Sequence, residues 1–181
     1  MKKACVFLGS AFGTKEIYSA EAIKLGQELV KRDLTLIYGG SSLGLMGLLA
    51  NTVKQHGGKA IGIITEHLID KEKPLTILDE LHVVDSIQER KLMMQQMADV
   101  FIIMPGGLGT LEEAFETWCA VKTGALQKDI GFLNTDGYFD GMFQFINHCE
   151  DNGFLSHAQN AIPHSDSDVV SLMGKLLKDG D

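Results

Sequence analysis

The sequence predicts an α/β protein built on one doubly wound, Rossmann-like and mostly parallel sheet with helices on both faces. Short apolar segments alternate with amphipathic segments along the whole chain, which is typical of successive βαβ units. The apolar segments are continuous rather than alternating, as expected for strands buried on both faces. Glycine clusters follow three of these segments. The length of 181 residues favours a single domain spanning residues 1–181.

Strands are expected at residues 4–8, 34–38, 59–64, 81–84, 99–104 and 130–134, with a short last strand at 160–163. Helices are expected at residues 14–31, 45–56, 86–97, 110–122, 138–151 and 168–178. Two helix starts carry a capping-box pattern, Ser86 with Glu89 and Ser165 with Asp168. Residues 65–79 are polar and irregular, so we expect a loop or a mobile flap there. The first helix should bury a stripe of Ile17, Ala20, Ala22, Ile23, Leu25, Leu29 and Val30.

Composition and charge indicate an ordinary globular protein of the cytoplasm. Apolar residues make up 45% of the chain, and the formal net charge is −8 with no dense run of Lys or Arg, which disfavours a nucleic-acid partner. Cys5, Cys119 and Cys149 are widely spaced and fit reduced thiols. The apolar run at residues 4–8 is too short for a signal peptide. Since no segment approaches the ~20 apolar residues of a membrane span, we expect no membrane association.

The strongest functional signal is the segment DVFIIMPGGLGTLEE at residues 99–113, where a buried strand leads into a glycine turn and a helix. Gly106, Gly107 and Gly109 allow positive φ angles and a close approach of the backbone to a ligand. The free amides and the dipole of the helix start favour an anion, and Thr110 adds a hydroxyl donor. A tight turn without a ligand needs fewer glycines. This loop is therefore predicted to hold a phosphate group.

Glu113 lies one turn into the following helix, on the side of the predicted phosphate loop. From there its carboxylate would reach a ribose whose phosphate is held by the loop. Thr110 and Glu113 also form a capping-box pattern, in which Glu113 would only satisfy the Thr110 amide. The residues alone leave both roles open.

Arg90 and Lys91 occupy the first half of the helix predicted at residues 86–97. One interpretation is a pair of cations exposed to solvent. The other is that they belong to the site, in which case Arg90 projects toward the same sheet edge as the glycine loop. Methionines in this helix, Met94 among them, belong to the core more often than to a ligand site.

Two further glycine clusters should meet the phosphate loop, because the carboxyl ends of parallel strands lie at one edge of a sheet. They follow the strands predicted at residues 4–8 and 34–38 and have the sequences GSAFG and GGSSLG. The candidate substrate-binding residues are Gly9, Ser10, Gly40, Lys91 and Met94.

Several other site types are excluded by their missing patterns. The loop at residues 105–110 lacks the Gly-Lys-Ser/Thr of a Walker loop, and none of the clusters has the GxGxxG spacing of a dinucleotide site. No GxSxG elbow is present, and the six histidines are scattered without a metal-ligand spacing. We expect neither a cofactor nor a metal.

The chain resembles the Lonely Guy family over nearly its whole length. The motifs that carry the resemblance are Glu89-Arg90-Lys91 and the segments FIIMPGGLGTLEE, CVFLGSAFG, LIYGGSSLGLMG and GFLNTDGYFD. Members of this family are cytokinin riboside 5′-monophosphate phosphoribohydrolases, often labelled lysine decarboxylases. The resemblance implies a doubly wound fold, usually dimeric, that cleaves the base–ribose bond and yields free base and ribose 5-phosphate. Arg90 and Glu113 would be the catalytic residues, while Gly106, Gly107, Gly109 and Thr110 would hold the 5′-phosphate.

AMP or an N6-substituted adenine nucleotide, such as a cytokinin riboside monophosphate, is the expected substrate, and a homodimer is the expected assembly. One alternative is a non-enzymatic carrier of a phosphate-bearing ligand such as molybdenum cofactor. Proteins that carry this cofactor resemble the chain in their fold and glycine loop. The presence of both Arg90 and Glu113 favours the enzyme, because a carrier needs no such residues. A lysine decarboxylase would need pyridoxal phosphate on a buried lysine, and no lysine is expected in such a setting.

Overall fold

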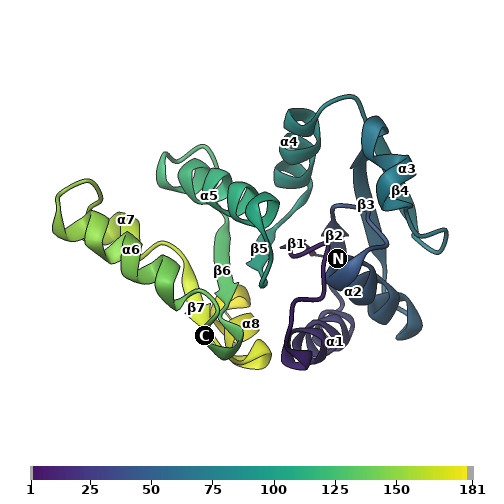
Figure 1. Ribbon diagram of the computed structural model, residues 1–181, viewed down its shortest axis with the longest axis horizontal. Helices are drawn as coiled ribbons and strands as arrows, with labels where there is room; N and C mark the ends of the chain where they lie inside the picture. Colours follow the sequence, from purple (N-terminus) through teal and green to yellow (C-terminus); the bar gives the residue numbers. More distant parts are fainter. Residues whose placement is uncertain (1, 179–181) are drawn as a thin grey trace.

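The fold is that of a computed structural model that describes residues 2–178, so residues 1 and 179–181 of the predicted domain lie outside it (Figure 1). Seven strands form one sheet in the order β4-β3-β2-β1-β5-β6-β7, and every neighbouring pair is parallel. This confirms the predicted doubly wound α/β fold. The strands are β1 (Lys3–Phe7), β2 (Thr35–Tyr38), β3 (Ala60–Thr65), β4 (Glu80–Val84), β5 (Val100–Ile103), β6 (Asp129–Leu133) and β7 (His164–Asp166).

Helices connect the strands and cover both faces of the sheet. Within residues 2–178, none of them is long and apolar enough to cross a bilayer. Two short 3₁₀ helices occur as well, η1 (Glu66–Leu68) and η2 (Thr135–Gly137). The α-helices are α1 (Glu16–Lys31), α2 (Gly44–Gln55), α3 (Ile69–Glu72), α4 (Ile87–Met97), α5 (Leu108–Lys122), α6 (Asp140–Asp151), α7 (His157–Asn160) and α8 (Val169–Leu177).

Two cores lie on opposite faces of the sheet (Figure 1). α1, α2 and α8 pack over one face, and α4, α5 and α6 pack over the other. Neighbouring residues of β1 point into different cores, Val6 into the first and Phe7 into the second, as the pleat of a strand requires. Because both faces are buried, the central strands are mostly apolar, and this produced the strand signal in the sequence.

Trp118, the only tryptophan of the chain, fixes α5 within the second core and is 4% exposed. Its ring stacks on Phe115 with a centroid distance of 5.9 Å and meets Phe132 of β6 edge-on at 6.2 Å. Its Nε1 donates a hydrogen bond to the backbone oxygen of Gln159 in α7 at 3.1 Å. These contacts hold the helix that begins at the predicted phosphate loop.

The strand order changes direction between β1 and β5, the point at which doubly wound sheets form a ligand crevice. After β1 the chain builds β2, β3 and β4 on one side, and it returns to place β5 on the other side. Phe7 pairs with Ile103, so the loops after both strands leave the sheet side by side. The amide of Gly9 donates to the carbonyl oxygen of Pro105 at 3.1 Å and ties the two loops together.

Local predictions near the C-terminus are wrong in two respects. The last strand is β7 at His164–Asp166 rather than residues 160–163, and Ser165 lies inside it instead of capping a helix. β7 is a three-residue edge strand with polar residues, so it carries no apolar run that would predict it. Asp168 is instead the N-cap of α8 and accepts a hydrogen bond from the Ser171 amide at 2.9 Å.

The buried stripe predicted for α1 is also partly wrong. Ile17 and Ile23 are 43% and 38% exposed, and Ala20 is exposed as well. Tyr18 is buried instead and meets Tyr138 edge-on at 5.7 Å, which turns this face of the helix inward. The residues that α1 buries are Tyr18, Ala22, Leu25, Gly26, Glu28 and Leu29.

Residues 65–79, predicted to be irregular, contain η1 and the single-turn helix α3. The expectation of irregular structure is therefore wrong for residues 66–72 and right for residues 73–79. At the start of α4 the Ser86 cap is confirmed, because its Oγ accepts from the Glu89 amide at 3.1 Å. The reciprocal half of the capping box is absent there, since Glu89 accepts from the Asp85 amide at 3.2 Å instead.

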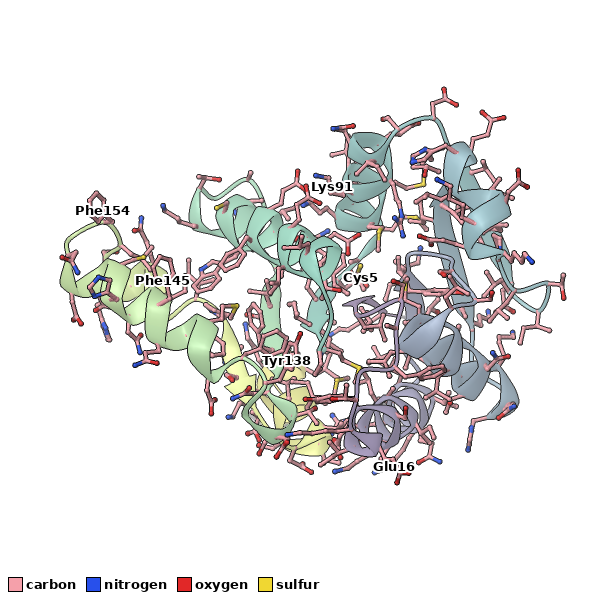
Figure 2. All side chains as sticks on the ribbon, in the orientation of Figure 1. Cys5, Glu16, Lys91, Tyr138, Phe145 and Phe154 are labelled. Atoms are coloured by element: carbon pink, nitrogen blue, oxygen red, sulfur yellow. The ribbon has the colours of Figure 1, made fainter. Side chains whose placement is uncertain are left out.

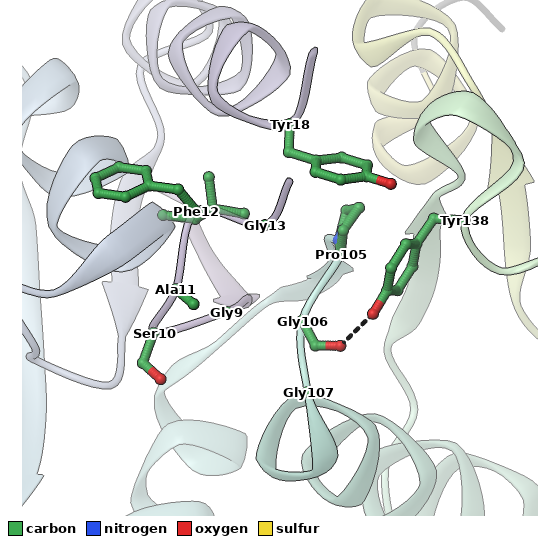
Figure 3. Close-up of a pocket in the computed structure, with 11 residues that line it drawn as sticks. Gly9, Ser10, Ala11, Phe12, Gly13, Tyr18, Pro105, Gly106, Gly107 and Tyr138 are labelled. Atoms are coloured by element: carbon green, nitrogen blue, oxygen red, sulfur yellow. Dashed lines mark hydrogen bonds between the residues drawn. The ribbon is translucent and has the colours of Figure 1, made fainter. Parts of the chain in front are cut away.

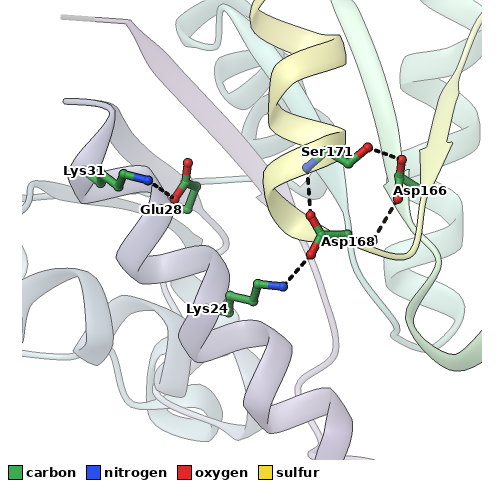
Figure 4. A network of polar contacts seen from close by, with 6 residues as sticks. All are labelled: Lys24, Glu28, Lys31, Asp166, Asp168 and Ser171. Carbon is green, nitrogen blue, oxygen red and sulfur yellow. Dashed lines mark hydrogen bonds and ion pairs between the residues drawn. The ribbon is translucent and has the colours of Figure 1, made fainter.

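A polar network joins α8 to α1 at the end of the chain (Figure 4). Asp168 accepts from Lys24 of α1 at 2.6 Å, while Asp166 of β7 accepts from Ser171 and from Lys175. Hydrogen bonds from Lys175 and Ser171 hold the pKa of Asp166 far below its usual range. The network thus joins α1 to α8 within the helical layer that covers the first core.

Candidate active site

A cavity of about 220 Å³ lies at the carboxyl edge of the sheet, beside the crossing of the β1 and β5 loops. It brings together residues that are far apart in the sequence, from the loops after β1 and β5 and from α2, α3, α4 and α5. Its lining residues are Leu8, Ser10, Met46, Glu72, Arg90, Gly107, Leu108, Gly109, Thr110 and Glu113.

The predicted phosphate loop forms one wall of this cavity. α5 begins at Leu108, with Gly107 as a cap residue that offers no side-chain acceptor. The first hydrogen bond of the helix runs from the Leu111 amide to the Gly107 carbonyl oxygen at 3.1 Å. The amides of residues 108–110 are therefore left without an intrahelical partner at the positive end of a 15-residue helix. This end of α5 is suited to an anion.

The glycines of the loop act through their missing side chains rather than through unusual φ angles. None of the three has a positive φ, so the expectation of left-handed backbone is wrong. A Cβ on Gly107 or Gly109 would meet no protein atom within 4 Å, so both face open space. A Cβ on Gly106 would instead lie 2.1 Å from the Thr110 hydroxyl. Gly106 serves the packing of the loop, and Gly107 and Gly109 leave room for a ligand.

Arg90 reaches the cavity from α4 and is only 8% exposed. Its Nε donates to the carbonyl oxygen of Ile63 and its Nη2 to that of Gly39, both at 2.8 Å. A Cβ on Gly39 would lie 2.0 Å from Nη2, so the guanidinium fits there only because this residue is glycine. Neither bond is to a carboxylate, so the guanidinium keeps an unneutralised positive charge at the cavity wall.

Glu113 lines the same cavity and is half-buried. Burial raises the pKa of Glu113 from 4.5 to about 7. The charges of Glu112 and Glu72 add to this rise, while those of Arg90 and Lys91 oppose it. Because α5 begins at Leu108, Thr110 is inside the helix and not at its cap, so the capping-box role for Glu113 is wrong.

Glu72 also lines the cavity, and sequence reasoning missed it. It is the last residue of α3, in the segment that lacked a periodic pattern. Its Oε2 is buried and has no hydrogen-bond partner among the described residues. The only sequence signal was a single acidic residue in a polar stretch, which resembles any solvated side chain.

A second hollow of about 280 Å³ lies on the other side of the loop crossing and shares Ser10 and Gly107 with the first (Figure 3). Gly9 and Gly106 line it, together with the aromatic rings of Phe12, Tyr18 and Tyr138. The hydroxyl of Tyr138 donates to the Gly106 carbonyl oxygen at 2.6 Å (Figure 3). Gly9 therefore lies beside the glycine loop but outside the cavity that contains Arg90 and Glu113.

Three predicted substrate-binding residues, Gly40, Lys91 and Met94, line neither hollow. Met94 is 1% exposed and packs in the second core, while Met46 of α2 lines the cavity instead. Gly40 has a positive φ of 77° and packs against Ile64. The turn after β2 therefore requires a glycine at this position.

Lys91 is buried at 8% exposure but points away from the cavity, toward α5 (Figure 2). Its Nζ forms ion pairs with Glu112 and, at 2.9 Å, with Glu116. The expectation that no lysine is buried is therefore wrong. The hydrogen bond that Lys91 donates to the Glu112 carboxylate raises the pKa of Lys91, which keeps the amine charged and unsuited to a Schiff base with pyridoxal phosphate. Lys91 instead joins α4 to α5, so that Arg90 and Glu113 keep their relative positions.

The fold and the cavity together define an α/β protein with an open glycine loop at a helix start, beside a buried arginine and a half-buried glutamate. Among residues 2–178 there is no group of three or more His, Cys, Asp or Glu side chains able to hold a metal ion. The family model described as "Possible lysine decarboxylase" matches residues 46–176.

Curated relatives are similar over almost the whole chain. The cytokinin riboside 5′-monophosphate phosphoribohydrolase LOG5 of Arabidopsis thaliana is 43% identical, covering 97% of this chain and 77% of the relative. A probable enzyme of the same name from Oryza sativa, LOGL9, is 40% identical over the same shares. The chain belongs to this family of phosphoribohydrolases, as the sequence motifs predicted.

Solved structures support the fold at lower sequence identity. The molybdenum cofactor carrier protein of Chlamydomonas reinhardtii superposes with a TM-score of 0.70 at 20% identity, covering 98% of this chain and 99% of the other. The molybdenum cofactor binding protein of Rippkaea orientalis gives a TM-score of 0.72 at 22% identity, covering 98% and 96%. At these identities the likeness extends to the fold alone.

Proposed function

We propose that this protein hydrolyses the N-glycosidic bond of a nucleoside 5′-monophosphate and releases free base and ribose 5-phosphate. AMP or an N6-substituted adenine nucleotide, such as a cytokinin riboside monophosphate, is the substrate. The observation that carries the proposal is that Arg90 and Glu113 line one cavity together with the open helix start at Gly107–Thr110. The names of the relatives at about 40% identity agree with it.

In this mechanism the 5′-phosphate binds at the start of α5. The free amides of residues 108–110 donate to its oxygens, and the hydroxyl of Thr110 adds a further donor. Gly107 and Gly109 allow the phosphate to approach the backbone, since no protein atom occupies the space above them. Binding at this point directs the ribose toward Glu113, one helical turn further along α5.

Cleavage of the bond between C1′ and the base passes through a state with positive charge on the ribose ring. The ionised carboxylate of Glu113 stabilises that charge and orients the attacking water. One water is consumed: its oxygen bonds to C1′, the electron pair of the broken bond stays on the base, and the base gains a proton. Since the pKa of Glu113 is about 7, roughly half of the molecules hold the active, ionised form at pH 7.

Arg90 acts by its charge and not as an acid, because a guanidinium keeps its proton at any working pH. The bonds to Ile63 and Gly39 fix its position before substrate arrives, so no ordering is needed during the reaction. Its positive charge lies where it favours the departing base, which gains negative charge. Neither a metal nor an organic cofactor takes part in this scheme.

We also propose that the protein is a cytoplasmic homodimer. Large apolar side chains remain exposed on the layer formed by α4, α5 and α6, and two of them stand out at its outer end (Figure 2). Large exposed apolar side chains of this kind are typical of an interface. The exposed side chains are Leu92, Leu108, Phe145 and Phe154. Analytical ultracentrifugation should give twice the mass of the chain, and a monomer at micromolar concentration would contradict the assembly.

The test of the proposed reaction is incubation of the purified protein with AMP and with isopentenyl-adenosine monophosphate, followed by chromatography for free base. We expect release of base from the nucleotides and none from the matching nucleosides, because the phosphate provides the binding energy. If the nucleotides bind but stay intact, the hydrolase proposal fails and a carrier function takes its place.

A further inference from the structure

Tyr138 contacts the glycine loop after β5 from the side of the second hollow. Its hydroxyl donates to the Gly106 carbonyl oxygen at 2.6 Å, so the segment after β6 is bonded to a residue 32 positions earlier in the chain (Figure 3). Tyr138 lines the second hollow and not the cavity that contains Arg90 and Glu113. Any effect of Tyr138 on that cavity therefore passes through the loop.

The hydrogen bond fixes the orientation of the peptide group between Gly106 and Gly107. This peptide is trans, because no cis peptide occurs within residues 2–178, and its carbonyl oxygen and amide hydrogen point in opposite directions. The carbonyl oxygen faces Tyr138 in the second hollow, so the Gly107 amide faces the cavity on the other side of the loop. This amide has no hydrogen-bond partner among the described residues. It is a free donor next to the free amides of residues 108–110.

The loop itself does little to hold this peptide group. Both of its residues are glycines, whose backbone has more conformational freedom than that of any other residue. No backbone amide of residues 2–178 donates to the Gly106 carbonyl oxygen. A rotated peptide group would present this oxygen to the cavity, where it would repel a phosphate instead of donating to it. The Tyr138 hydroxyl favours the orientation that suits an anion.

Tyr138 is held in place by its own surroundings. It follows a tight turn in which Asp136 and Gly137 have positive φ angles of 52° and 69°. Its neighbour Phe139 is 1% exposed and meets the Tyr138 ring edge-on at a centroid distance of 5.0 Å. The side chain of Asn134 accepts from the Phe139 amide at 2.7 Å. The segment after β6 therefore determines where the hydroxyl lies before any ligand binds.

We propose that Tyr138 is a positioning residue, which holds the Gly107 amide toward the cavity as a further donor to the phosphate of the bound nucleotide. This inference rests on the proposed function, because it places a phosphate at the start of α5. It requires no part of the nucleotide to enter the second hollow.

The test compares Tyr138→Phe with the wild-type protein. The substitution removes the hydroxyl and keeps the ring that packs against Tyr18 and Phe139. We expect KM for AMP to rise about tenfold, because one hydrogen bond to a charged group is weakened. Since Glu113 and Arg90 are untouched, kcat should stay within about twofold of the wild type. The affinity for inorganic phosphate, measured by calorimetry, should fall about tenfold as well.

Tyr18→Phe is the matched control, since Tyr18 lines the same hollow and its hydroxyl has no hydrogen-bond partner among the described residues. It should leave KM, kcat and the phosphate affinity within about twofold of the wild type. A lower melting temperature of Tyr138→Phe with unchanged KM and phosphate affinity would show a structural role alone and overturn the inference, while the hydrolase proposal stands. If the wild type cleaves no nucleotide, the hydrolase proposal fails, and the phosphate affinities decide the inference separately, with equal values in all three proteins counting against it.

Discussion

The glycine loop after β5 and the glycine loop after β2 end at the same edge of the sheet, yet their glycines face different surroundings. In the first, Gly107 and Gly109 have open space where a Cβ would be. In the second, the corresponding space is filled by protein: Arg90 beside Gly39, and the Ser10 backbone 2.3 Å from a Cβ on Gly44. The first loop therefore leaves room for a ligand, whereas the second receives the side chains and backbone that shape the site.

This difference shows that a glycine cluster after a buried strand has two meanings that the sequence alone does not separate. Both clusters predict a close approach to the backbone: in the second loop Arg90 makes such an approach to Gly39, and in the first loop the space beside Gly107 and Gly109 is open. What approaches is decided by elements distant in the chain, since Arg90 is 51 residues from Gly39. Substitutions in the two loops should consequently affect different properties of the protein.

The largest effect is expected at Glu113, which is carried by the helix that the first loop begins. Glu113→Gln keeps the shape of the side chain but removes the charge that stabilises the ribose cation, so kcat should fall about 100-fold or more. Steady-state kinetics with AMP measures this. Lys122→Gln, an exposed residue in the last turn of the same helix, should retain wild-type turnover. Normal turnover of Glu113→Gln would exclude it as a catalytic residue.

A related effect on stability should follow from the raised pKa of Glu113. Between its usual value of 4.5 and about 7, the unfolded chain loses this proton while the folded protein keeps it. The free energy of unfolding should therefore decrease as pH rises from 5 to 8, by about 1–3 kcal/mol from this group. Urea denaturation of the wild type and of Glu113→Gln at both pH values isolates the contribution. An equal pH dependence in both proteins would contradict the raised pKa.

Gly39→Ala tests the second loop and should reduce activity without blocking the phosphate site. The added Cβ would lie 2.0 Å from the Arg90 guanidinium and push it from its position. We expect kcat/KM for AMP to fall about 10- to 100-fold through this misplacement. Gly174→Ala, in open space on α8, is the control and should stay fully active. Unchanged kinetics in Gly39→Ala would mean that the position of Arg90 is unimportant.

The smallest effect separates two adjacent glycines of the first loop. Gly107→Ala meets no protein atom, so its thermal stability should equal that of the wild type while KM for the nucleotide rises about tenfold. Gly106→Ala would collide with Thr110 and should lose about 1–3 kcal/mol of stability. Calorimetric melting and kinetics on both variants measure the contrast. A loss of stability in Gly107→Ala would indicate that the loop does not leave room for a ligand.

Much of the fold was predictable because the central strands are short apolar runs that end at glycines. The sheet, the order of strands and helices, and the meeting of the loops at one edge follow from that pattern. The position of the edge strand β7 was predicted wrongly because it consists of polar residues. Only its pairing with β6 makes this segment a strand. Local periodicity carries no information about such a partner.

Within the candidate site, Arg90, Glu113, Ser10 and Thr110 were predicted and lie around one cavity. Met94 was misassigned because three methionines on α4 leave the buried and exposed faces of that helix without a clear pattern. Glu72 was missed because its position depends on hydrogen bonds from Ser41 and Ser42, about 30 residues earlier in the chain. Both failures concern orientation fixed by tertiary contacts.

The lone tryptophan also provides an optical signal at a useful place. Trp118 is shielded from water within the helix that starts at the phosphate loop and bears Glu113, and no second indole contributes to the emission. Its fluorescence spectrum should therefore shift to longer wavelength when α5 separates from the sheet and leaves the indole in water. Unlabelled protein thus reports loosening of α5 itself, separately from the average helix content that circular dichroism measures.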